Sequence, residues 1–471
     1  MNGTDHINRL KNLVSDREFV SLWNEDKWYT YKEIWDMALF ISGSLDFEHT
    51  ERVVVIREND LCMFVLFFSA MLSNTTIVPV DPRKSEKEID LILSDNRDAL
   101  IIRDEDLLCD FSADASTGEA GLIAKINAID LEKLYSITYT SGSTGHPKGV
   151  RHSLNNLFGS GLSFAALTGL TEKNTMCHVM PMSYMAGILN TILMPFICGC
   201  RIAILPRFDV MSAIRFWKSV ETKKIDSFWL SPTMLNMIMT VDRRRTAKEY
   251  LGTIEPLFFI GTAPLFENTR NDFENGYDVK LLQSYGLSET LFLSAEVPGR
   301  IRDTRSVGYL LPEVSATFDD AGEIKIDVPW MYMGYTNEPT EDYFEGSRYL
   351  TGDLGYEKDG MLYITGRKKD LIIKGGMNIS PKQIEDTVSK HDAIMECSVS
   401  GVTVHEEERI ICWYVSRRSD EGIEAQINRM IETDIGKHCR IDEFIKVGEI
   451  PKNLNGKSDK NRLVSEYKND L

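Results

Sequence analysis

A run of small polar residues around one lysine, YTSGSTGHPKGVRHS at residues 139–153, has the residue types that bind phosphate groups. Glycine lets the backbone approach a ligand closely and present its N–H groups. The hydroxyls of Ser141, Ser143 and Thr144 add hydrogen-bond donors, and the lysine, Lys148, adds a positive charge. Such runs are also typical of plain flexible turns, so a loop without a ligand is the alternative. The stretch is not a Walker A loop, because proline stands directly before the lysine, where GxxxxGK[ST] has glycine.

The segments around this loop alternate between strand and helix patterns. LYSITYT (residues 134–140) predicts a strand that runs into the loop, and residues 153–170 predict a helix after it, so we expect a strand–loop–helix arrangement. Residues 28–45 predict an amphipathic helix that begins after Thr30 as its cap. The apolar run at residues 61–72 predicts a buried helix that is too short to span a membrane. This alternation indicates an α/β fold with parallel-rich sheets covered by helices.

Length and charge limit the domain organisation and the partners. The chain has 471 residues, enough for two or three domains. A β-rich stretch ends near Arg367, so we predict a large N-terminal domain at residues 1–366 and a small α+β C-terminal domain at residues 367–471. The formal charge of −18 argues against a nucleic-acid partner. Since the first residues show no apolar export signal, we expect a cytoplasmic location.

Four further stretches follow the loop in order: IGTAPL (260–265), QSYGLSET (283–290), YLTGDLGY (349–356) and PKNLNGKSDK (451–460). With the loop, they resemble in order and spacing the motifs of the adenylate-forming superfamily, which includes acyl-CoA synthetases, amino-acid adenylation domains and luciferases. The resemblance covers nearly the whole chain. It implies a large N-terminal adenylation domain, a small mobile C-terminal domain, and the use of ATP, Mg²⁺ and either CoA or a carrier-protein phosphopantetheine.

The resemblance also implies where ATP binds. The loop would hold the β- and γ-phosphates, Tyr285 would stack on the adenine, and Ser288 would bind the α-phosphate. Asp353 would accept hydrogen bonds from both ribose hydroxyls, with Arg367 beside it. The nucleotide-binding residues implied in this way are Thr140, Ser141, Gly142, Ser143, Thr144, Gly145, Lys148, Gly261, Thr262, Ala263, Ser284, Tyr285, Gly286, Ser288, Asp353 and Arg367.

The implied catalytic residues are Lys148, Ser288 and Lys457, and Glu289 would hold Mg²⁺. Lys457 would bridge the attacking carboxylate and the α-phosphate, because two anions must meet there. The first step would give an acyl-adenylate and pyrophosphate, and a thiol would then release AMP. Lys369 falls at the hinge position, about which the C-terminal domain would take two arrangements.

The substrate is expected to be a small carboxylic acid. Family members that activate amino acids usually have an aspartate in the stretch that corresponds to residues 178–190, which contains no acid here. The candidate pocket residues Tyr184, Met185, Phe228 and Trp229 are apolar or aromatic, which favours an aryl acid or a short to medium acyl chain; plain core packing is the alternative. CoA is the expected acceptor, and an acyl or aryl carrier protein is the alternative. A non-catalytic nucleotide-binding protein is an alternative of another class.

Overall fold

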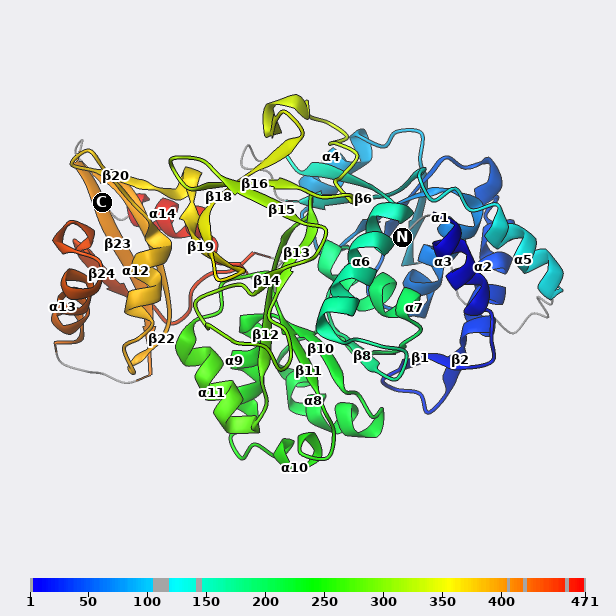
Figure 1. The fold of residues 1–471 in the computed structure, drawn as a ribbon, viewed down its shortest axis with the longest axis horizontal. Coiled ribbons are helices and arrows are strands. Elements are labelled where there is room, and N and C mark those ends of the chain that lie inside the picture. The colour runs from blue at the N-terminus through cyan, green and yellow to red at the C-terminus, as the bar shows by residue number, and fades with distance from the viewer. Residues whose placement is uncertain are drawn as a thin grey trace.

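The protein forms a large α/β N-terminal domain and a small C-terminal domain, as the sequence predicts. The computed structural model describes residues 3–104, 118–140, 146–404, 407–417, 422–453 and 457–469. Figure 1 shows the N-terminal helices in blue at one end of the molecule and the C-terminal domain in orange to red at the other. The exact boundary between the domains, placed at residues 366 and 367 from the sequence, stays a prediction.

A five-stranded sheet carries the predicted phosphate loop. Its strands lie in the order β5–β3–β4–β6–β7. Their bounds are β3 (Arg52–Ile56), β4 (Thr76–Val80), β5 (Leu100–Arg103), β6 (Leu134–Thr140) and β7 (Lys148–Ser153). Strand β4 pairs in parallel with β3 and with β6, and β3 with β5, whereas β7 is antiparallel to β6. Strand β4 is buried at every position, as expected for a parallel strand that is covered on both faces.

The loop between β6 and β7 has a different context from the one predicted. Strand β6 spans residues 134–140 as expected, and the helix predicted at residues 153–170 is confirmed, but residues 148–153, expected to be part of the loop, form a strand. Strand β7 comes first, and α6 (Leu154–Thr168) begins only after Ser153, its N-cap. The sequence of β7, KGVRHS, is short and polar, so it lacks the apolar run by which a strand is predicted. The loop therefore closes a β-hairpin in which Thr140 lies opposite Lys148.

The second sheet has 14 strands and joins a parallel half to an antiparallel half. The parallel half contains β1 (Glu18–Leu22), β8 (Thr175–His178), β9 (Arg201–Ile204), β10 (Ser227–Leu230), β11 (Leu257–Ile260) and β12 (Leu281–Leu287), with β2 (Trp28–Thr30) at its edge. The other half contains β13 (Leu291–Ala295), β14 (Tyr309–Leu310), β15 (Ser315–Phe318), β16 (Glu323–Asp327), β17 (Phe344–Glu345), β18 (Arg348–Lys358) and β19 (Met361–Arg367). Strand β12 connects them, because it is parallel to β11 and antiparallel to β13. The carboxyl ends of β10 and β11 therefore lie beside the β12–β13 hairpin.

Helices cover these sheets and were predicted well where their patterns are strong. Helix α2 (Tyr31–Ser44) begins after Thr30, which forms a capping box with Glu33. Helix α3 (Leu61–Ser73) is buried from Leu61 to Leu72. The remaining N-terminal-domain helices are α1 (Gly3–Asn12), α4 (Glu86–Ser94), α5 (Glu119–Asn127), η3 (Ala186–Leu193), α7 (Met194–Cys198), α8 (Val210–Thr222), α9 (Pro232–Val241), α10 (Lys248–Leu251) and α11 (Glu267–Tyr277), with short 3₁₀ turns at η1 (Phe47–His49) and η4 (Glu341–Tyr343).

The C-terminal domain has its own core and packs against α9 and α11. It contains the hairpin β20 (Ile372–Lys374) and β21 (Met377–Ile379), the sheet β22 (Ile394–Val404), β23 (Glu407–Ser416) and β24 (Glu443–Lys446), helices α12 (Pro381–Val388), α13 (Ile423–Asp434) and α14 (Lys460–Asn469), and the turns η5 (Lys368–Asp370) and η6 (Lys437–Cys439). Arg417 forms an ion pair with Asp272 of α11. Lys452 Nζ donates a hydrogen bond to Thr233 Oγ1 of α9 at 3.0 Å. These contacts hold the two domains together.

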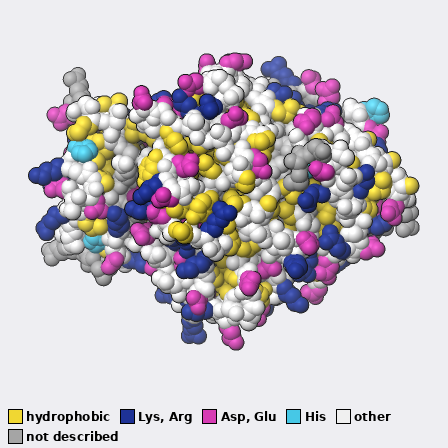
Figure 2. Space-filling model, viewed as in Figure 1, with side chains coloured by type: hydrophobic (Ala, Val, Ile, Leu, Met, Phe, Trp, Pro, Cys, Tyr) yellow, Lys and Arg dark blue, Asp and Glu magenta, His cyan; other side chains and the backbone are white. Residues whose placement is uncertain are grey.

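Charged side chains of both signs share the surface. On the face in Figure 2, basic and acidic side chains are interspersed, so the net negative charge is not concentrated there. Within the described residues, no helix is both long enough and apolar enough to span a membrane.

Gly286 is required where the hairpin between β12 and β13 brings two backbones together. A Cβ at residue 286 would lie 2.1 Å from the carbonyl oxygen of Leu291. We therefore expect Gly286→Ala to lower the free energy of unfolding by about 1–3 kcal/mol, because overpacking would force the strands apart. Urea denaturation measures the change.

Gly43 is the matched control for this substitution. It lies within α2, and a Cβ there would meet nothing within 4 Å. Gly43→Ala should raise the free energy of unfolding by about 0.5–1 kcal/mol, because alanine is the better helix former. A Gly286→Ala variant as stable as the wild type would contradict the close approach of the backbone at Gly286 to the carbonyl oxygen of Leu291.

Candidate functional site

Asp353 is the centre of a buried polar cluster. It lies on β18 opposite Arg367 of β19. Arg367 Nε donates a hydrogen bond to Asp353 Oδ1 at 2.6 Å, and the hydroxyl of Tyr285 donates one to Asp353 Oδ2 at 2.7 Å. Asp353 is only 4% exposed, so its charge requires such partners. The structure thus brings together three of the predicted site residues.

The electrostatics of this cluster keep the guanidinium of Arg367 charged and the phenol of Tyr285 neutral. Burial, and then the carboxylate of Asp353, raise the pKa of Tyr285 well above its usual value. Burial alone would lower the pKa of Arg367, but the charge of Asp353 outweighs it, and the net pKa is raised. Both carboxylate oxygens of Asp353 therefore accept hydrogen bonds, an arrangement that also suits two neighbouring sugar hydroxyls.

Lys457 reaches the same place from the C-terminal domain. Its side chain contacts solvent, yet enough protein surrounds it to lower the pKa of its ammonium group. The positive charge of Arg367 lowers this pKa further, whereas the carboxylates of Asp353 and Glu289 raise it. Asn453 holds the backbone: Lys457 N donates to Asn453 Oδ1 at 3.1 Å, and Asn453 N donates to the carbonyl of Lys457 at 2.9 Å. Both domains therefore contribute to one site.

Lys148, at the start of β7, is held by an acid and two tyrosines. Its Nζ lies 2.6 Å from Glu338 Oε2 and donates a hydrogen bond to the hydroxyl of Tyr343. The rings of Tyr343 and Tyr335 lie 4.8 and 5.4 Å from the same atom. Burial alone would lower the pKa of Lys148, but the hydrogen bonds to Glu338 and Tyr343 outweigh it and raise the pKa. The ammonium group is therefore charged and has two close polar partners, Glu338 and Tyr343.

Glu289 interacts with Tyr335, whose ring lies beside Lys148, and with Tyr184 of the predicted acid pocket. Its Oε1 accepts a hydrogen bond from the hydroxyl of Tyr335 at 2.8 Å, and its carbonyl accepts one from Tyr332 N at 2.9 Å. Burial, and then the charge of Glu289, raise the pKa of Tyr184 to about 12, which places Tyr184 within electrostatic reach. Among the described residues, no three His, Cys, Asp or Glu side chains gather to hold a metal alone. A single carboxylate that shares Mg²⁺ with phosphate oxygens fits this site.

His152, which the sequence reasoning missed, supports the segment that carries Ser288 and Glu289. It lies on β7, is fully buried, and donates from Nε2 to the carbonyl oxygen of Ser288 at 2.7 Å. Burial lowers the pKa of His152 to about 4, so the imidazole is neutral at pH 7. The sequence did contain a signal for His152: in KGVRHS, Lys148, Val150 and His152 are every second residue. In a strand they lie on one face, which puts the histidine on the same side as the lysine.

The predicted adenine segment follows β11 and contacts β12. Ser284 Oγ donates to the carbonyl of Ile260 at 3.3 Å. A Cβ at Gly261 would lie 3.1 Å from Ser284 Oγ, a tight contact, and 3.5 Å from the ring of Trp229, an ordinary van der Waals contact. The structure thus places Gly261, Ser284 and Trp229 side by side.

Thr262 has an unusual backbone conformation. Its φ is 71°, in the left-handed region that β-branched residues rarely adopt. Its Oγ1 is buried and has no hydrogen-bond partner among the described residues. Backbone strain of this kind is concentrated at functional sites. Ala263 follows it and is half-buried.

The four predicted pocket residues are not all brought together. Phe228 and Trp229 are neighbours on β10 and therefore point to opposite faces of the sheet. Phe228 stacks on Phe258 with ring centroids 4.2 Å apart, inside a separate core cluster. Trp229 packs against Phe164 on the side of the site. Met185 is buried in the same core as Trp229, whereas Phe228 lies away from the site.

Other predicted residues lie at the border of the described structure. Ser141, Gly142, Ser143, Thr144 and Gly145 lie outside the described residues, between Thr140 and Lys148. Lys369 is exposed in η5 and lies close enough to Lys457 to lower its pKa.

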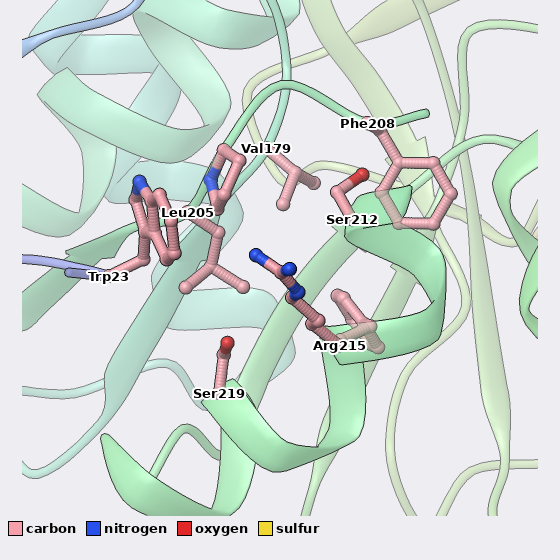
Figure 3. Close-up of a pocket in the computed structure, with 9 residues that line it drawn as sticks. Trp23, Val179, Leu205, Phe208, Ser212, Arg215 and Ser219 are labelled. Carbon is pink, nitrogen blue, oxygen red and sulfur yellow. The ribbon is translucent and has the colours of Figure 1, made fainter. Parts of the chain in front are cut away.

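Figure 3 shows a recess beside α8. Its lining residues are Trp23, Val179, Leu205, Pro206, Phe208, Ser212, Arg215, Phe216 and Ser219. Its cavity volume of ≈ 10 Å³ is about the smallest that can hold one water molecule. We therefore assign no ligand to it.

Two family models match the chain. The model described as AMP-binding enzyme matches residues 10–336, and the model described as AMP-binding enzyme C-terminal domain matches residues 383–457. The first match contains the Lys148, Tyr285 and Glu289 positions, and the second ends at Lys457.

Similar proteins carry the names of CoA ligases. A 2-succinylbenzoate–CoA ligase of Listeria monocytogenes serotype 4b is 26% identical over 461 residues, which cover 94% of this chain and 95% of that protein. A long-chain-fatty-acid–CoA ligase of Mycobacterium tuberculosis is 27% identical over 457 residues and covers 88% of each chain. The ATP-bound crystal structure of MatB from Rhodopseudomonas palustris has a TM-score of 0.84 at 23% identity and covers 100% of both chains, which shows the shared fold.

The buried histidine predicts an acid sensitivity of the fold. Unfolding returns the pKa of His152 from about 4 to the ordinary 6.5, so the unfolded chain binds more protons in this window. Stability is therefore fully present above pH 6.5 and falls as the pH drops towards 4. When the pH is lowered from 7.5 to 5, the titration of His152 alone should lower the free energy of unfolding by about 2 kcal/mol.

Urea denaturation at both pH values, on the wild type and on His152→Gln, isolates this contribution. Glutamine keeps an N–H donor for the Ser288 carbonyl but does not titrate. The variant should lose less stability on acidification than the wild type, since other groups titrate equally in both. Equal losses would show that His152 is not a buried neutral group.

Proposed function

Because the chain belongs to the family of AMP-binding enzymes, we propose that it activates a carboxylic acid with ATP and transfers the acyl group to the thiol of CoA. It is an AMP-forming acid–thiol ligase of the acyl- or aryl-CoA synthetase type. The observation that carries this proposal is the convergence of Tyr285, Asp353 and Arg367 with Lys457 of the other domain.

The nucleoside of ATP would bind at the Asp353 cluster. The carboxylate of Asp353 would bind the ribose hydroxyls, with Arg367 beside it, and the ring of Tyr285 would stack on the adenine. The short backbone segment at residues 261–263, with Ser284 and Gly286 of β12, would line the adenine. The absence of a side chain at Gly261 supports this role, because it leaves a flat backbone surface beside Ser284.

The phosphates would bind along the β6–β7 hairpin. Thr140 and the loop residues 141–145 would donate hydrogen bonds to the β- and γ-phosphates, Lys148 would supply positive charge, and Ser288 would bind the α-phosphate. Mg²⁺, held by Glu289 and phosphate oxygens, would neutralise charge on the departing group. Lys148 is paired with Glu338 and Tyr343, and an anionic ligand could replace Glu338 as its partner. This arrangement supports an anion site at Lys148.

The chemistry follows from the charges of the substrates. A carboxylate oxygen of the acid attacks the α-phosphorus, the bond to the bridging oxygen of the β-phosphate breaks, and pyrophosphate leaves. Lys457 lies between the two anions and stabilises the additional charge of the transition state. The CoA thiolate then attacks the acyl carbon, and AMP leaves with the bonding electrons. The C-terminal domain would pivot at Lys369 between the two steps.

The acid is proposed to be an aryl acid or a short to medium acyl chain. Tyr184, Met185 and Trp229 would form its pocket. The aromatic contacts of Trp229 with Phe164 and Phe292 support an apolar pocket on this side of β10. Of the two relatives described above, one is named for an aryl acid, 2-succinylbenzoate, and the other for a long-chain fatty acid, which is longer than the acyl chains proposed here.

The proposal is tested by exchange of labelled pyrophosphate into ATP with a panel of aryl, short-chain and long-chain acids, followed by addition of CoA. We expect exchange with one class of acid, and AMP with a CoA thioester once CoA is present. Exchange without a CoA product would assign the acceptor thiol to a carrier protein. Absence of exchange with every acid would contradict acid activation.

Replacement of Lys457 separates the two steps. Lys457→Ala should lower acid-dependent pyrophosphate exchange by about 10²–10³-fold, because the transition state loses a positive charge. It should leave thioester formation from preformed acyl-adenylate largely intact. Lys468→Ala, which removes an exposed lysine of α14, is the matched control and should change neither step. A Lys457→Ala variant that loses both steps equally would contradict the role of Lys457.

A further inference from the structure

The connection between β16 and β18, residues 328–347, runs along the strand that carries Lys148. Met333 N donates to the carbonyl of Arg151 at 2.8 Å, and Arg151 N donates back to the carbonyl of Gly334 at 3.2 Å. Asn337 Nδ2 donates to the carbonyl of Pro147 at 2.8 Å. The connection is therefore hydrogen-bonded to β7 over several residues, and its side chains are held beside the ammonium group of Lys148.

Glu338 and Tyr343 of this connection close a ring of hydrogen bonds with Lys148. Lys148 Nζ donates to the hydroxyl of Tyr343, and that hydroxyl donates to Glu338 Oε1 at 2.6 Å. Glu338 Oε2 lies 2.6 Å from Nζ, which completes the ring. The side chains of Lys148 and Glu338 are 18% and 32% exposed, so the pair is shielded but remains accessible to a ligand.

A carboxylate in this position offers Lys148 the same contacts as a phosphate group. Both present anionic oxygens to the ammonium group, and a bound phosphate beside Glu338 would bring like charges together. A polyphosphate therefore competes with Glu338 for Lys148. Tyr343 can accept from Lys148 in either state, since a phenolic hydroxyl both donates and accepts.

We propose that the carboxylate of Glu338 is an internal substitute for the departing phosphate. Glu338 binds Lys148 when no nucleotide is bound, and it binds Lys148 again as pyrophosphate leaves. This inference rests on the proposed function, which places the ATP phosphates at Lys148. Glu338 is thus a positioning residue: it acts through Lys148 and sets how tightly polyphosphates bind. It weakens the binding of both ATP and pyrophosphate, and it speeds the release of pyrophosphate.

The test compares binding of inorganic pyrophosphate with Mg²⁺ to the wild-type protein and to Glu338→Gln, by isothermal titration calorimetry without any acid. Glutamine keeps an acceptor for the hydroxyl of Tyr343 and removes only the competing charge. We expect about three- to tenfold tighter pyrophosphate binding, since a shielded ion pair no longer opposes it. The KM for MgATP should fall by a similar factor, and Glu338→Asp should return both values towards the wild type.

Glu341→Gln is the matched control, because it removes an exposed carboxylate from the same connection. It should leave pyrophosphate binding within twofold of the wild type. An equal gain in pyrophosphate affinity in this control would show that the effect comes from the net charge alone, and it would overturn the inference.

The remaining outcomes separate the inference from the proposed function. Unchanged or weaker binding by Glu338→Gln, with a wild type that binds pyrophosphate, overturns the inference alone; weaker binding would indicate that Glu338 contributes to a metal site or to folding. A wild type that binds neither pyrophosphate nor ATP overturns the proposed function and the inference with it.

Discussion

The ion pair between Asp353 and Arg367 is the contact on which the site depends. A carboxylate that is 4% exposed is stable only with close partners, and its partners come from β12, from β19 and, by charge, from the C-terminal domain. The hydrogen bond from Tyr285 to the same carboxylate links β12 of the parallel half to β18 of the antiparallel half. The charge of Arg367 lowers the pKa of Lys457 in the C-terminal domain, and the carboxylate of Asp353 partly offsets this.

The site gathers positive charge in a chain whose formal charge is −18. Lys148 and Arg367 each have a carboxylate partner within 2.6 Å, and Lys457 lies within reach of two carboxylates. Without these partners, the cations would repel one another and lose solvation. The partners are also what an anionic substrate must replace or share. In the proposed function, polyphosphate would therefore bind by exchange of anions, rather than by filling a site of free cations.

Local elements were predictable from the sequence, and contacts between distant segments were not. The cap at Thr30, the strand at residues 134–140 and the buried helix at residues 61–72 depend on residues close together in the chain, and the structure has all three. Strand β7 escaped prediction because its polar residues are stabilised by pairing with β6 and by the β16–β18 connection.

Side-chain partners were the hardest to predict. The motif order indicated Asp353, Arg367 and Lys457 as site residues, but it carried no signal for Glu338 or for the bond from His152 to Ser288. These contacts join segments more than 100 residues apart. Strand β10 shows a further limit: all four of its residues are buried, so its pattern does not tell which of its two faces lies towards the site.

The central claim is that an oxygen of the acid attacks the α-phosphorus of ATP. It is tested most directly with an acid whose carboxylate carries ¹⁸O, under turnover with ATP and CoA, by mass spectrometry of the AMP formed. One ¹⁸O atom is expected in AMP, because the acyl–oxygen bond breaks in the second step. AMP that carries no ¹⁸O from the acid, or the formation of ADP in its place, would contradict it.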